Sequence, residues 1–330
     1  MGVLAASSSS ILIRYAQQDG IDSLAIAAWR MTLASLVLLP MALATRRREF
    51  RRLAPRSVAL ALLAGLFLAV HFTAWITSLE YTSVASSAAL VTTNPIWVGL
   101  ATVVLFRERL ARLTVAGIAI SLLGCLLILW VDYQAGGQLE AAAGAAGGAA
   151  GSMAGSVAGS AAGEAAAIAA AAATGADGRQ PMLGNSLALF GAVCVSAYLL
   201  TGRRVAARFS LLAYVTVVYG AAAVMLMLVA LAAGVELWRY PASGWAALAG
   251  LALLPQLIGH TAFNWSLRRL SPTFVALSIL GEPVGSAILA SLLFAETPSA
   301  LQSGAFATLL AGIAVAALGE RRPRQPAAAA

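Results

Sequence analysis

The residue best placed to do chemistry in this chain of 330 residues is Glu282. It lies inside an apolar run, between Gly281 and Pro283. A charged side chain at the centre of a membrane costs about 2.5–3.5 kcal/mol or more, so such residues usually face a cavity and bind or exchange ions. The alternative role is structural, in which Glu282 caps a half-helix that begins at Pro283. The two roles can coexist, and Glu282 is therefore the first candidate site residue.

Asn94 is the neutral counterpart of Glu282 in an internal repeat. An offset of 188 positions places Asn94-Pro95 on Glu282-Pro283 and residues 105–108 on 293–296 without a gap. Asn followed by Pro is a common helix start, so we expect Pro95 and Pro283 to break the helices that contain them. A helix N-terminus that faces a cavity offers partial positive charge to an anionic group, such as the carboxylate of an amino-acid-like solute.

Three further polar side chains lie in apolar runs. Arg30 can pair with Glu282 or with a substrate carboxylate, and the competing interpretation is that it extends outward or pairs with Asp22. His71 and His260 occupy nearly equivalent runs of the two halves and can line a cavity or carry protons. Neither histidine has a carboxylate or a second histidine at ligand spacing, so we expect no metal site and no cofactor.

Aromatic and small residues on the same runs have weaker interpretations. An apolar pocket can be lined by four aromatic residues, Trp75, Trp97, Phe263 and Trp265, although packing and interfacial positions are commoner for tryptophan in membranes. Close packing of the fifth and tenth predicted helices is favoured by four glycines, Gly117, Gly124, Gly304 and Gly312.

Composition places these residues in a lipid bilayer. The residues AVILMFWYC form 61% of the chain and charged residues only 10%, whereas soluble domains have about a quarter charged residues. The net charge of +8 does not indicate a nucleic-acid partner, because the arginines form short clusters between apolar runs. Both cysteines lie in apolar runs, so no disulfide framework is expected.

A spanning helix needs about 20 apolar residues, and ten runs approach or reach that length. They are 2–17, 24–44, 57–79, 84–106, 113–131, 183–202, 211–234, 245–267, 273–294 and 300–318. We therefore predict an all-α polytopic membrane protein with ten transmembrane helices. The first run is short for a span, which suggests that the natural chain begins upstream of Met1.

The arginines predict the orientation. With ten spans, 17 of the 21 arginines fall on the side of both termini, which is then the cytoplasmic side of a cell (inner) membrane. The chain divides into a five-helix repeat at 1–133, an extracytoplasmic Ala/Gly/Ser-rich linker at 134–181, a second five-helix repeat at 182–320 and a cytoplasmic tail at 321–330. Because five is odd, the two repeats must cross the membrane in opposite directions, and the charges of their aligned loops are swapped accordingly.

A family resemblance follows from these features. Two five-helix repeats, Pro95 and Pro283 midway along helices 4 and 9, and Glu108 and Glu296 just after them resemble the EamA branch of the drug/metabolite transporter superfamily. The stretch 78–86 is also similar to the helix 3–4 junction of that family. The resemblance implies a metabolite carrier, often an exporter, with a central cavity between helices 1–4 and 6–9 and with helices 5 and 10 peripheral.

We therefore expect a secondary transporter that moves a small organic metabolite by alternating access, with proton coupling at Glu282 and no enzymatic activity. A homodimer is compatible with this reading. The runner-up is a multidrug or cationic-compound exporter. Two other classes are a membrane enzyme acting on lipid, which would need a catalytic cluster that the loops lack, and a scaffold or sensor. The chain has no GxxxxGK[ST] motif, so ATP is not its direct driver.

Overall fold

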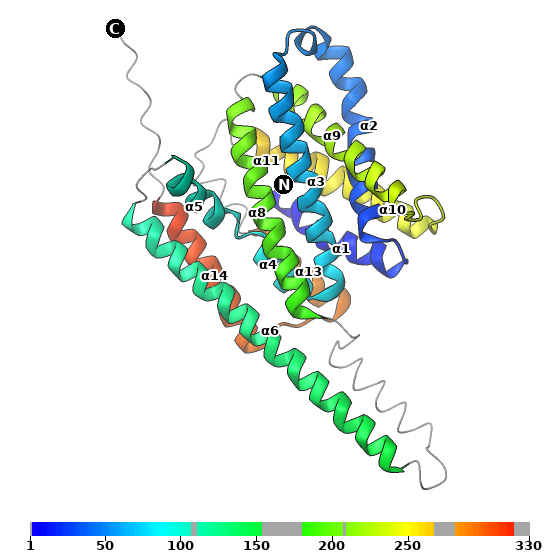
Figure 1. Ribbon diagram of the computed structural model, residues 1–330, viewed down its shortest axis with the longest axis vertical. Helices are drawn as coiled ribbons and strands as arrows, with labels where there is room; N and C mark the ends of the chain where they lie inside the picture. Colours follow the sequence, from blue (N-terminus) through cyan, green and yellow to red (C-terminus); the bar gives the residue numbers. More distant parts are fainter. Residues whose placement is uncertain (1, 107–110, 154–179, 207–208, 267–280, 320–330) are drawn as a thin grey trace.

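The computed structural model describes residues 2–106, 111–153, 180–206, 209–266 and 281–319 (Figure 1). These residues form helices and short connections, without a strand among them. The helices are α1 (Gly2–Gln18), α2 (Ser23–Phe50), α3 (Pro55–Tyr81), α4 (Val84–Val91), α5 (Asn94–Phe106), α6 (Arg112–Met153), α8 (Pro181–Ala206), α9 (Leu211–Ala232), α10 (Ala242–Leu251), the π-helix η1 (Ala252–His260), α11 (Thr261–Ser266), α13 (Gly281–Phe294) and α14 (Ala300–Gly319).

Seven of the described helical segments are long and apolar enough to cross a membrane. They are 23–50, 55–81, 84–101, 112–134, 181–202, 211–232 and 242–266. Two shorter apolar helices cover 282–294 and 300–316, and α1 carries four consecutive serines at 7–10. The all-helical membrane fold is thus confirmed, while the described residues provide seven spans of full length rather than ten. Residues 273–280, the start of the expected ninth helix, lie outside the described residues.

The expected fourth helix is broken just before Pro95. Its first part, α4, ends at Val91 and α5 begins at Asn94. Pro95 has no N–H to donate to the preceding turn. Next to the break, threonine hydroxyls add bonds to helix carbonyls that already accept a backbone N–H, since Thr92 Oγ1 donates to the oxygen of Ala88 (3.0 Å) and Thr93 Oγ1 to that of Leu90 (2.7 Å). The break expected from Pro95 is therefore present. The equivalent break at Pro283 borders the undescribed stretch.

Two helices differ from their predicted extents. We expected a helix at 113–131 followed by an irregular linker, but α6 continues to Met153 and extends beyond the other helices (Figure 1). Alanine, which is abundant there, has the highest helix propensity and outweighs the interspersed glycines. The remaining part of the linker, 154–179, lies outside the described residues.

The second difference is the π-helix η1, which interrupts the expected helix 245–267. Pro255 lies inside this segment and removes the N–H that the α-helical turn would require. Widened turns of this kind are rare and frequently occur at functional sites. Here the turn contains Gln256 and His260, both of which contribute to the site described below.

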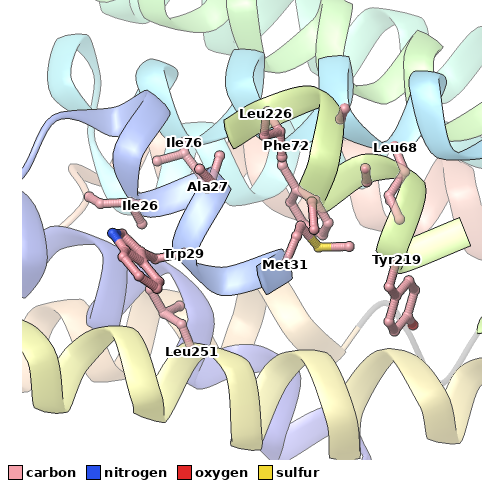
Figure 2. Packing of buried hydrophobic residues seen from close by; sticks show 14 of the residues in the cluster. Ile26, Ala27, Trp29, Met31, Leu68, Phe72, Ile76, Tyr219, Leu226 and Leu251 are labelled. Atoms are coloured by element: carbon pink, nitrogen blue, oxygen red, sulfur yellow. The ribbon is translucent and has the colours of Figure 1, made fainter. Parts of the chain in front are cut away.

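The core forms where helices of the two halves pack together. In this interior α2 packs against α9, α3 against α8 and α9, and α1 against α10, η1 and α13. Figure 2 shows buried side chains of this interior, with Met31 next to Phe72 and Tyr219 farther along the same cluster. The pair α6 and α14 lies beside this bundle (Figure 1), as the resemblance implies for helices 5 and 10.

Glycine allows α6 and α14 to approach closely. A β-carbon on Gly124 would lie 2.5 Å from the backbone nitrogen of Leu309, and one on Gly312 would lie 2.3 Å from that of Ser121. Such contacts with backbone cannot be relieved by rotating a side chain. Gly304 has no atom within 4 Å of its would-be β-carbon, so the expectation that it shares this interface is wrong.

Candidate functional site

Arg30 lies at the centre of the candidate site. Its side chain is fully buried, on the inner face of α2. Its Nε donates to Oε1 of Gln256 in η1 (2.9 Å), and its Nη1 donates to the hydroxyl of Ser9 in α1 (2.8 Å). The Phe72 ring of α3 covers one face of the guanidinium, with Cζ 4.2 Å from the ring centre. Arg30 therefore joins helices from both halves of the chain.

The interpretation in which Arg30 extends outward or pairs with Asp22 is wrong. Asp22 instead caps α2, where its carboxylate accepts a hydrogen bond from the N–H of Leu24 (2.7 Å). A buried guanidinium is costly unless its N–H groups find partners. Ser9 and Gln256 supply two such partners, and neither could be assigned to Arg30 from sequence spacing.

Tyr219 interacts with Gln256 and Thr261, but four buried polar atoms around Arg30 make no hydrogen bond of normal geometry in the described structure. They are Arg30 Nη2, Gln256 Nε2, Trp75 Nε1 and the Tyr219 hydroxyl. Three of the four are obligatory donors. The Trp75 ring centre lies 5.8 Å from Arg30 Cζ, and Tyr219 interacts electrostatically with Arg30. Unpaired buried donors are rare in native proteins, and each cluster of them calls for an explanation.

The two candidate histidines lie at the edge of this cluster. His71 Nδ1 contacts the carbonyl oxygen of Gly191 in α8 at 2.9 Å. A carbonyl only accepts, so Nδ1 must carry the hydrogen, which leaves Nε2 as the acceptor in a neutral ring. The His71 ring stacks on Trp75, with centroids 5.9 Å apart, and His260 meets the Phe72 ring edge-on at 5.7 Å. Both histidines thus share aromatic neighbours with Arg30.

Glu282 enters the site from the first turn of α13. It interacts electrostatically with Arg30, but no ion pair joins the two among the described residues. The main chain of this turn is held by α1, since the carbonyl of Glu282 accepts from the Ser7 hydroxyl (3.3 Å) and Ser286 donates to the carbonyl of Ser7 (3.1 Å). Gly285 allows this approach, because a β-carbon there would lie 2.4 Å from the Ser7 hydroxyl.

The other predicted site residues lie elsewhere. Asn94 begins α5, and its carbonyl accepts from Ser196 of α8 (3.1 Å). Trp97, also in α5, donates through its indole to the Thr93 hydroxyl (3.0 Å). Trp265 in α11 is largely exposed. The described contacts place none of these three residues against Arg30. The same contacts do bring Trp75, His71, His260 and Glu282 together around Arg30.

Sequence reasoning overlooked Gln256 and Tyr219 in this site. Gln256 is an uncharged polar residue in an apolar run directly after Pro255, and that position could have marked it. Tyr219 lies in α9 without any distinctive spacing. The structure turns its ring away from α9 toward the helix that carries Gln256 (Figure 2).

A second polar network joins the helices at one end of the bundle, and of its residues only Glu296 was singled out from the sequence, for the family resemblance and not for these contacts. Arg14 of α1 pairs with Glu296 (3.5 Å) and donates to the carbonyl of Thr82 (3.0 Å). The Thr82 hydroxyl donates to Asn185 (2.9 Å), and Asn185 in turn donates to Asp132 (2.8 Å). The network therefore links five parts of the chain. They are α1, the loop between α3 and α4, α6, α8 and the segment that follows α13. The arginine distribution predicts that this end is extracytoplasmic.

The helices and their polar interior define the chain as a multi-pass helical membrane protein. Comparisons with known proteins specify it further. A sequence model of the EamA-like transporter family matches residues 1–130 and 182–318, so the chain belongs to that family. The matched stretches leave out all of the Ala/Gly/Ser-rich linker at 134–181.

A protein known from a crystal structure has a similar fold, with a TM-score of 0.62. It is 21% identical, and the match covers 98% of this chain and 96% of that one. At this identity the likeness extends to the fold alone. A search of curated proteins gave no match.

Proposed function

We propose that this protein is a secondary active transporter for a small organic metabolite, with an amino-acid-like solute favoured. The observation that carries the proposal is the pair Arg30 and Glu282, two opposite charges inside the bundle that interact but form no ion pair with each other. A solute with its own cationic and anionic groups can satisfy both. Charged side chains within membrane segments typically mark a substrate or ion pathway.

In this proposal the carboxylate of Glu282 is the group that couples proton movement to solute transport. A solute ammonium that reaches Glu282 competes with a proton for the same carboxylate. Loading the solute from one side and a proton from the other therefore exchanges the two. This competition couples export of the solute to entry of protons, and it needs no nucleotide.

Alternating access is supported by how the helices pair. If each helix of the first half is exchanged for its counterpart in the second, the contact of α3 with α8 becomes the contact of α1 with α10 and η1. The same exchange leaves two contacts unchanged, namely the contact between α2 and α9 and the contact between α6 and α14. This pattern is the one expected of two repeats related by a two-fold axis, and carriers built from inverted repeats rock one repeat against the other around a central site.

Export is the favoured direction. In the described structure the network of Arg14, Glu296 and Thr82 ties together the end that the arginines assign to the outside. A carrier closed at this end exchanges solute with the cytoplasm, which is the state in which an exporter would load. Release outside then requires that these contacts separate.

Efflux of cationic compounds is the second candidate. The aromatic side chains of Phe72, Trp75 and Phe263, together with the carboxylate of Glu282, are features that attract organic cations. The buried guanidinium of Arg30 repels them, which is why the zwitterionic solute is preferred.

The test is metabolite profiling of medium and cells in strains that express the native protein or Glu282→Gln at matched membrane levels. Glu236→Gln, a change on an exposed connection, is the control. We expect a solute to accumulate outside cells with the native protein and the control, and to be lost with Glu282→Gln. Equal export by all three would contradict coupling at Glu282, and accumulation inside cells would reverse the direction.

A further inference from the structure

We propose that Arg30, Gln256, Tyr219 and Trp75 form a subsite for a single carboxylate group of the transported solute. This inference rests on the proposed transport function and specifies the chemical class of its substrate.

The first step is the excess of donors. Arg30 Nη2, Gln256 Nε2 and Trp75 Nε1 can only donate, and the Tyr219 hydroxyl can do so. All four atoms are buried and make no hydrogen bond of normal geometry in the described structure, while Tyr219 interacts at longer range with Gln256 and Thr261. Gln256 is fixed against Arg30 by the 2.9 Å bond to Nε. A buried donor without an acceptor costs about 1–3 kcal/mol. An occupant with several acceptor oxygens removes this cost at several atoms together.

The second step is the charge of the occupant. Arg30 supplies a fixed positive charge, and a carboxylate provides about four lone-pair sites for charge-assisted hydrogen bonds. A phosphate dianion fits less well, because Glu282 lies within electrostatic reach of Arg30 and repels a second negative charge. His71 and His260 border the same region, but neither side chain forms an ion pair in the described structure. One carboxylate is therefore the group that matches the site.

The third step is geometric selectivity. Phe72 covers a face of the guanidinium at 4.2 Å, and Ser9 and Gln256 occupy Nη1 and Nε. The edge that carries Nη2 is thus the part of the guanidinium left without a partner for a solute acceptor. This restriction favours a small planar acceptor.

The binding test uses the purified full-length protein in detergent and thermal-shift titrations. The probes are the L-α-amino acids and simple monocarboxylates, each compared with its own amide, at one fixed neutral pH. We expect at least one carboxylate to raise the melting temperature and its amide to bind at least about tenfold more weakly, a loss of about 1.4 kcal/mol. Equal binding of acid and amide, or no stabilisation by any carboxylate, would overturn the subsite.

Three variants separate recognition from folding. Gln256→Glu places a carboxylate of the protein itself against Arg30, so the protein should keep its fold, gain stability without ligand and bind the acid at least about tenfold more weakly. Tyr219→Phe should weaken binding by a few fold, since it removes one hydrogen bond. Arg30→Lys keeps the charge and should bind the acid with intermediate affinity. Unchanged affinity of Gln256→Glu would contradict the proposal even if Arg30 variants fail to fold.

The binding and transport experiments together show whether the carboxylate subsite or the proposed transport function has failed. If the acid binds through Arg30 while Glu282→Gln transports normally, proton coupling is wrong and the subsite stands. If only organic cations shift the melting temperature, the subsite is wrong and cation efflux takes its place.

Discussion

Arg30 and Glu282 differ in how completely their surroundings satisfy them. Arg30 has two hydrogen-bond partners and an aromatic cover, yet its Nη2 is unpaired. The Glu282 side chain has only an electrostatic interaction with Arg30 among the described contacts. Two incompletely satisfied charges inside one bundle contribute little to stability, because burying polar groups without full partners costs free energy. They make a good device for binding a solute that completes them.

Glu236, on the connection between α9 and α10, gives a pH-dependent prediction. Its Oε1 accepts N–H bonds from Trp238 (2.9 Å), Leu237 (3.1 Å) and Arg239 (3.3 Å), and the bond from Trp238 is the main cause that lowers the pKa of this carboxyl below its ordinary value of 4.5. A lowered pKa stabilises the fold above the ordinary value, and this contribution is lost as the pH falls through the folded-state pKa.

We expect Glu236→Gln to remove that part of the acid response. Trp238 meets the Trp29 ring edge-on at 5.0 Å, so tryptophan fluorescence reports on this connection. The native protein should show a fluorescence change at pH below 4.5 that the variant lacks. An identical acid profile in the two proteins would show that the three N–H bonds do not hold the carboxylate ionised.

The packing of α6 against α14 depends on glycine rather than on large side chains. In water, helices are pulled together by burying apolar surface, but lipid tails remove that driving force. Close backbone approach then supplies the van der Waals contact. Gly117 illustrates this, since a β-carbon there would lie 2.1 Å from the backbone nitrogen of Ala316.

We therefore expect Gly124→Ala and Gly312→Ala each to lower the free energy of unfolding by about 1–3 kcal/mol, the usual cost of overpacking. Gly304→Ala is the matched control on the same helix, and it should be neutral or slightly stabilising because alanine favours helix. Denaturant titration in detergent, followed by circular dichroism, measures the three changes. Equal effects of Gly304→Ala and Gly312→Ala would mean that the two helices do not meet at these glycines.

The distribution of arginine around the bundle gives a prediction for the molecule as a whole. With 17 of 21 arginines on one side, both termini should lie in the cytoplasm and residues 134–181 outside. A fluorescent protein fused after Ala330 should fluoresce, and alkaline phosphatase inserted at 134–181 should be active. If the two reporters mark the same side, the number of crossings between them is even, and the inverted arrangement of the halves is wrong.

Most of the architecture could be predicted from the amino-acid order. Apolar runs identified the helices, because a bilayer requires every spanning backbone to satisfy its own hydrogen bonds. Pro95 predicted the break between α4 and α5, since proline removes one specific donor. The family assignment also followed from these local features, and the match to the EamA-like family confirms it.

The composition of the site depended on tertiary contacts. Arg30 and Gln256 are separated by 226 residues and Arg14 and Thr82 by 68. Hydropathy reports that a helix is in lipid but does not report which of its faces meets which neighbour. Gly304 and Gly312 look alike in sequence, yet only Gly312 faces α6. The helices are therefore encoded locally, whereas the partners of each buried polar group are fixed only when the helices pack.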